Sequence, residues 1–111
     1  MQPAGWRLQP STDYAVPHHE LSHNALIQRF TQVQQRAYLA QANLDNLRLE
    51  ALSETDGAAW CELAYTEIPA AEELRAEALR ADAALRAEIA RRQALARQAG
   101  RALRARTNTR R

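Results

Sequence analysis

The sequence predicts an all-α protein: an antiparallel coiled-coil hairpin of two long helices with a short helical cap between them. Hydrophobic residues make up 46% of the 111-residue chain, and most of these are Ala and Leu. Glycine occurs only three times, and β-branched residues are few after position 35. Two long segments also repeat apolar residues at helical spacing. Together these observations favour closely packed helices over a sheet.

Residues 1–17 are expected to form an irregular arm. Pro3, Pro10 and Pro17 each push the preceding residue toward an extended conformation. Two interpretations of this arm stay open: disorder, or docking of its apolar side chains on the helices or on a partner.

Residues 18–52 are predicted to form the first long helix. Apolar residues or alanines recur from Leu26 to Ala51 in alternating steps of four and three. This is the heptad pattern of a left-handed coiled coil. Pro17 favours a helix start close by, because proline suits the first turn.

Residues 53–68 interrupt the pattern and are predicted to form a connector. Ser53 to Gly57 has the composition of a helix stop followed by a turn. From Ala58 to Ile68 the spacing predicts a short helix that caps the open end of the hairpin with Trp60. A partner-binding tip is the alternative. The acids that would make this end negative are Glu50, Glu54, Asp56, Glu62 and Glu67.

Residues 69–106 are predicted to form the second long helix, with Pro69 in its first turn and residues 107–111 frayed. Folding the chain back near residue 61 brings two apolar stripes together. The expected interaction seam is Leu26, Phe30, Val33, Leu44, Leu47, Leu74, Leu85 and Ile89. Because a lone hairpin buries only one face of each helix, we expect a homo-oligomer or a stable protein partner.

Charge is distributed unevenly along the chain. All 15 basic side chains are Arg, and all 13 acids lie within residues 1–90. The basic residues after position 90 are Arg91, Arg92, Arg97, Arg101, Arg104, Arg106, Arg110 and Arg111. This end predicts binding to an acidic protein partner or to nucleic-acid phosphates, and a solvated surface is the third interpretation. No aromatic residue lies among these arginines, so nucleic-acid binding would be sequence-tolerant.

Residues 19–23 read His-Glu-Leu-Ser-His and match the pattern H-E-x-x-H. The segment resembles the signature of the zincin metallopeptidases. That resemblance implies zinc bound by His19 and His23, with Glu20 activating water and Glu50 or Glu54 as a third ligand.

Helix geometry opposes this zinc site. On a continuous helix Glu50 would lie about 40 Å from His23. The arginines expected opposite the motif supply no lone pair for a metal. We therefore expect seam-end histidines at His19 and His23, with a metal site at an oligomer interface and a zinc-dependent hydrolase as weaker alternatives.

The sequence thus favours a non-enzymatic helical module for interaction, assembly or regulation. It would act through coiled-coil association with itself or with a protein partner, and a nucleic-acid-associated protein is the alternative. We expect no cofactor and no small-molecule substrate. The single Cys61, the absence of a signal-like apolar run and the lack of a membrane-length apolar segment favour a cytoplasmic protein.

Overall fold

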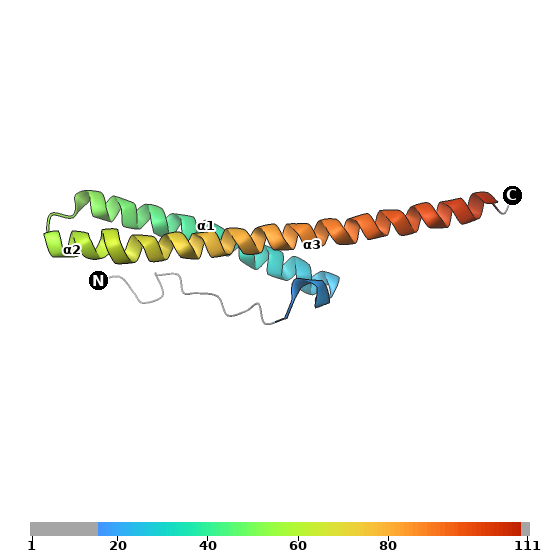
Figure 1. Cartoon of the computed structure of the whole chain (residues 1–111), viewed down its shortest axis with the longest axis horizontal. Coiled ribbons are helices and arrows are strands. Elements are labelled where there is room, and N and C mark those ends of the chain that lie inside the picture. Colours follow the sequence, from blue (N-terminus) through green and yellow to red (C-terminus); the bar gives the residue numbers. More distant parts are fainter. Residues whose placement is uncertain (1–15, 110–111) are drawn as a thin grey trace.

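A computed structural model describes residues 16–109 and shows an all-α helical hairpin, as the sequence predicts (Figure 1). The elements are η2 (His18–Glu20), α1 (His23–Ser53), α2 (Gly57–Glu62), η3 (Leu63–Glu67) and α3 (Ile68–Thr109). Residues 16–109 contain no strand. The molecule is a rod of 81 × 22 × 16 Å in which α1 crosses α3 (Figure 1).

The chain reverses direction within Glu54–Asp56, a much shorter connection than the predicted connector 53–68. The Asp56 carboxylate accepts a hydrogen bond from the Ala59 backbone N–H at 3.0 Å and so caps α2. Gly57 is therefore the first residue of a helix and not the end of one. The second arm begins about a dozen residues earlier than Pro69.

The second arm is one continuous helix formed by α2, η3 and α3 (Figure 1). The segment η3 is a single π-helical stretch that ends two residues before Pro69. Proline has no N–H to donate to the carbonyl of Tyr65, and a widened turn is one way to absorb that loss inside a helix. Pro69 therefore lies within the helical arm, where the sequence pattern suggested a helix start.

Helix α1 begins at His23, five residues later than the predicted residue 18. Ser22 has an extended backbone, and its hydroxyl accepts from the Ala25 N–H at 3.2 Å. This N-cap fixes the helix start more firmly than Pro17 does. The residues between them form the short 3₁₀ turn η2.

Two apolar clusters lie between the arms. One, near the tip, contains Leu44, Leu47, Leu63 and Ala71. The other contains Leu26, Val33 and Leu85. Of the predicted seam, Leu26, Val33, Leu44, Leu47 and Leu85 are buried, and Phe30, Leu74 and Ile89 are partly buried.

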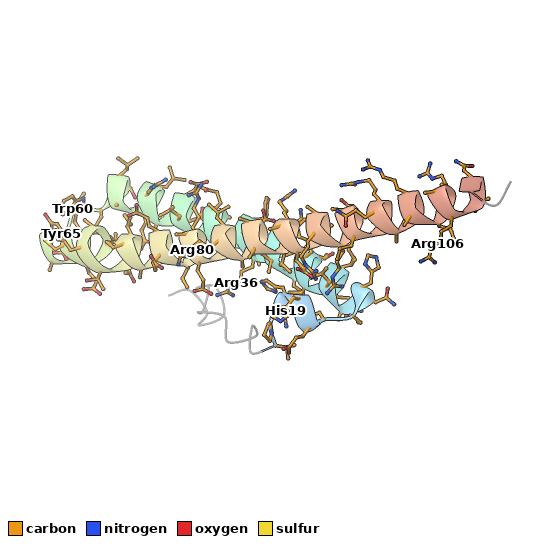
Figure 2. The ribbon with its side chains drawn as sticks, turned by 45° about the vertical axis from the view of Figure 1, so that its right-hand side comes forward. His19, Arg36, Trp60, Tyr65, Arg80 and Arg106 are labelled. Carbon is orange, nitrogen blue, oxygen red and sulfur yellow. The ribbon has the colours of Figure 1, made fainter. Side chains whose placement is uncertain are left out.

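Trp60 does not close the end of the hairpin as predicted. Its side chain is 41% exposed and packs edge-on against Tyr65, with ring centroids 5.9 Å apart (Figure 2). Leu63, the first residue of η3, takes the interior position and packs in one cluster with Leu44 and Leu47.

The two arms differ in length. His23, at the start of α1, lines the same small cavity as Ala96 of α3. The remainder of α3, about 20 Å at 1.5 Å per residue, continues alone to Thr109 (Figure 1). Within residues 16–109, no helix has both the length and the apolar character that a membrane crossing needs.

Candidate functional site

The predicted basic surface divides into two parts. Arg97, Arg101, Arg104 and Arg106 are exposed on the solitary end of α3, and Figure 2 shows nitrogen-tipped side chains around that end. Arg110 and Arg111 lie outside the described residues. At 100° per residue, Arg97, Arg101 and Arg104 share one face, whereas Arg106 lies on the opposite face with Ala99 and Ala102.

Arg91 and Arg92 are held by an internal ion-pair cluster. Arg91 donates two hydrogen bonds to the Glu88 carboxylate, at 2.8 and 2.6 Å, and Arg92 donates a third at 2.9 Å. These bonds from Arg91 and then Arg92 lower the pKa of Glu88 to about 2. Glu88 itself is buried, with 8% of its surface exposed.

Arg92 also joins the two arms of the hairpin. Its Nη2 donates to the carbonyl oxygens of Leu21 at 2.6 Å and His18 at 3.2 Å. Arg92 thereby fastens η2 against α3 and supplies donors to carbonyls at the end of a 3₁₀ turn. No periodicity predicts such a contact, because it joins residues more than seventy positions apart.

The histidine segment does not have the geometry of a zinc-binding helix. His19 lies in η2, Leu21 is extended, and His23 is the first residue of α1. The two histidines therefore do not stand one turn apart on a common helix face, which the H-E-x-x-H chemistry needs. Residues 16–109 contain no group of three or more His, Cys, Asp or Glu side chains placed to hold a metal ion.

His18 belongs to a contact between η2 and α1. Arg29 Nη1 donates to the Val16 carbonyl at 2.6 Å and lies 3.2 Å from His18 Nδ1. Burial, and then the neighbouring Arg29 charge, lower the pKa of His18, while Glu88 acts in the opposite direction. These contacts give the segment a role in fixing the hairpin end.

A groove lies at half the length of the rod. Gln34, Gln35, Tyr38 and Leu39 of α1 line a hollow of about 510 Å³. Tyr38 is 76% and Leu39 is 53% exposed. Sequence analysis did not single out this region, because neither residue lies on the heptad seam. The available signal was the pair of large apolar residues on the side of the helix away from that seam.

The position of this groove follows from the pairing of the arms. The Arg86 guanidinium lies over the Phe30 ring, 5.1 Å from its centroid. Gln34, one turn along α1, is therefore level with the region of Ala83 on the antiparallel arm. Ala83 is halfway between Gly57 and Thr109, the two ends of the second arm.

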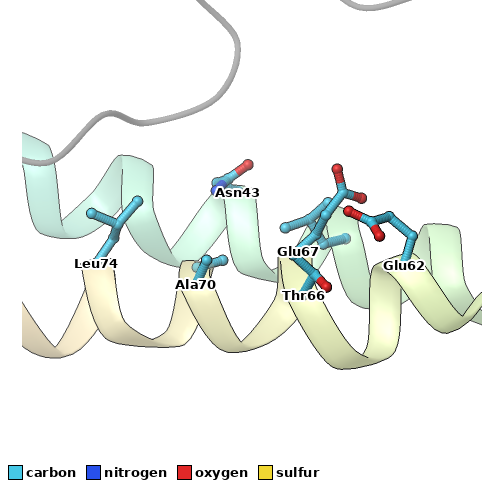
Figure 3. Close-up of a pocket in the computed structure, with 8 residues that line it drawn as sticks. Asn43, Glu62, Thr66, Glu67, Ala70 and Leu74 are labelled. Carbon is cyan, nitrogen blue, oxygen red and sulfur yellow. The ribbon is translucent and has the colours of Figure 1, made fainter.

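A second hollow, of about 300 Å³, lies near the acidic tip (Figure 3). It is lined by Asn43, Leu47, Glu62, Thr66, Glu67, Ala70, Ala71 and Leu74. Asn43 is buried, and its side-chain oxygen Oδ1 has no hydrogen-bond partner. In Figure 3 the oxygen-bearing ends of Asn43, Glu62 and Glu67 rise on the same side of the ribbons.

The chain matches no known protein family, no curated protein and no solved structure.

Proposed function

We propose that this protein is a non-enzymatic interaction module that self-associates as an antiparallel dimer of rods. The observation that carries the proposal is the exposed groove at half the length of a rod with oppositely charged ends. From Glu50 to Glu77 the only base is Arg75, whereas from Ile89 to Thr109 there are six arginines and no acid.

An antiparallel pairing satisfies both features at once. A twofold axis at the mid-point of the rod, level with the Gln34 end of the groove, would set the groove of one copy beside that of the other, since twofold interfaces use one patch twice. Each arginine-rich end would then lie beside the acidic tip of its partner. This complementarity opposes a parallel pairing, in which like charges would meet.

Burial also favours association. A two-helix rod leaves one side of each helix without a packing partner, and a chain of this size gains little from so thin a core. Exposed large apolar residues are spread along both arms, including Leu49, Leu52, Leu79 and Leu95. A dimer would remove part of this surface from water.

Sedimentation equilibrium tests the proposal. We expect a mass about twice the 12.5 kDa of one chain, and dissociation at lower protein concentration when salt is added, because salt screens the charged ends. Leu39→Glu should give monomers. Leu52→Glu is the matched control, since Leu52 is 85% exposed and lies on the opposite side of α1. A monomeric wild type, or equal behaviour of the two variants, refutes the proposal.

Binding of nucleic-acid phosphates is the second candidate function. Arg97, Arg101 and Arg104 share a face that the proposed dimer leaves exposed, opposite the face of Arg106. Binding to generic duplex DNA should weaken with salt at a log–log slope of about −0.9 per phosphate contact. Changing these three arginines to Gln should remove DNA binding and leave the dimer mass unchanged. If no DNA binds at low salt, this second function is excluded.

A further inference from the structure

We infer that the hollow at Asn43, Glu62 and Glu67 is a binding site for an arginine side chain, and that Arg106 of a second copy fills it. This inference rests on the proposed antiparallel dimer and names the contact made at each of its ends. Glu62 of this hollow lies about 30 Å along the second arm from the mid-point of that arm at Ala83.

The unpartnered amide oxygen of Asn43 is the first observation. Asn43 is 8% exposed, and its Oδ1 is shielded from water without a donor. A buried acceptor without a partner is destabilising, so its presence beside a hollow indicates a donor that comes from outside the chain. A leucine at position 43 would leave no buried side-chain acceptor without a hydrogen bond.

The other groups around the hollow define the donor as cationic. Glu62 and Glu67 supply carboxylates, and the Thr66 hydroxyl and the Asn43 amide supply neutral oxygens. A guanidinium carries five N–H donors in a planar fork and meets several such acceptors together. A volume of about 300 Å³ is at the lower limit for ligand pockets and suits a single side chain.

The π turn contributes to the shape of the site. The π-helical stretch η3 runs from Leu63 to Glu67. Glu62 before it, Glu67 at its end and Ala70 after it all line the hollow. An added residue in a helix changes the direction of the side chains around it, and such turns recur at functional sites. Here the π turn brings Glu62 and Glu67 to one hollow with Ala70.

The symmetry of the rod selects Arg106. Glu62 and Arg106 are equally spaced about Ala84, next to the mid-point of the arm at Ala83. In an antiparallel dimer about that point, Arg106 of one copy is therefore level with Glu62 of the other. Ala70, which lines the hollow, and Arg106 are about ten full turns apart and so lie on the same face of α3.

The neighbouring basic residue provides a matched control. Arg104 is two positions before Arg106, on the other side of the helix, where its Nε approaches the Gly100 carbonyl at 3.4 Å. A charge reversal at either position changes the net charge of the molecule equally. A difference between the two variants therefore reports on the site and not on general electrostatics.

The test measures the dimer dissociation constant of single and paired charge reversals by sedimentation. Arg106→Glu and Glu62→Arg should each weaken the dimer about tenfold or more, and Arg104→Glu should do so much less. The double variant Arg106→Glu with Glu62→Arg should recover most of the loss, because the pair is restored with its sign reversed. Equal effects of Arg104→Glu and Arg106→Glu, or no recovery, overturn the inference.

Asn43→Leu gives an independent measurement. This variant should weaken the dimer and at the same time raise the melting temperature of the dilute monomer, because the unpaired acceptor is gone. A purely structural asparagine would lower monomer stability when replaced. If the wild type is a dimer but the variants show none of these effects, the arginine site is refuted and the proposed self-association is not. If the wild type is a monomer, both proposals are refuted.

Discussion

At the scale of single residues, the Glu88 carboxylate makes the stability of the hairpin pH-dependent. Its pKa is lowered from 4.5 to about 2 in the folded protein, so the folded state favours the charged form. The resulting stabilisation is complete above about pH 4.5 and is lost as the pH falls toward 2. We expect the melting temperature of Glu88→Gln to be lower than that of wild type at pH 7, with the difference closing across this window.

Circular dichroism melts of the two proteins at a series of pH values measure that difference. The other carboxyl groups are common to both chains, so their titration cancels in the comparison. A gap between the two melting temperatures that stays constant from pH 5 to pH 2 would show that Glu88 does not carry this stabilisation.

A second residue-scale prediction concerns Arg92. Arg92→Met keeps much of the aliphatic stem and removes the donors to the carbonyls of His18 and Leu21. We expect a loss of about 1.5–3 kcal/mol, the range for hydrogen bonds to charged groups, and faster amide exchange near η2. Arg91→Met is the control, since Arg91 bonds only within α3. Equal exchange near η2 in both variants would contradict the role of Arg92.

At the scale of the helical elements, the seam residues should contribute to the stability of the hairpin only where α1 covers α3. Leu85 is fully buried, and Leu85→Ala should cost about 2–5 kcal/mol in urea unfolding. Leu103 continues the same stripe of α3 beyond the start of α1 and is 66% exposed. Leu103→Ala should change the stability of the dilute monomer by less than about 0.5 kcal/mol. A large effect at Leu103 would mean that the hairpin itself covers this end.

The seam and the helical hairpin could be predicted because both follow from repetition. Seven alternating steps over eight apolar or alanine positions leave one helix face to bury, and Leu26, Val33, Leu44 and Leu47 lie there. The ends of the elements depend on single contacts instead. The Ser22 hydroxyl sets the start of α1, the Asp56 carboxylate shortens the turn, and neither contact changes the periodicity.

The candidate sites were less accessible to sequence reasoning, for a related physical reason. The arginine-rich end is visible in the sequence, but its separation into paired Arg91 and Arg92 and an exposed remainder depends on Glu88 being buried. The hollow at Asn43 needs two arms and a π turn to exist. A local pattern cannot report on a site that only the folded arrangement creates.

At the scale of the whole molecule, the arginine-rich end of the rod serves association in the proposed dimer, and the rest of the rod contains the folded core. Removal of the arginine-rich end should therefore abolish association and leave folding intact. A chain that stops after Gln93 keeps both apolar clusters between the arms, because their residues all precede that point. It lacks the arginines that would lie beside the partner's tip. We expect this shortened chain to remain helical and to melt cooperatively as a monomer.

The dependence of the melting temperature on protein concentration distinguishes the two chains. Association with a second copy stabilises the folded state by mass action, so the wild type should melt at a higher temperature as its concentration rises. The chain ending at Gln93 should melt at one temperature over the same range. If its melting temperature rises with concentration as steeply as that of the wild type, the basic end takes no part in association. The contacts between copies would then have to come from the mid-length groove around Leu39 alone.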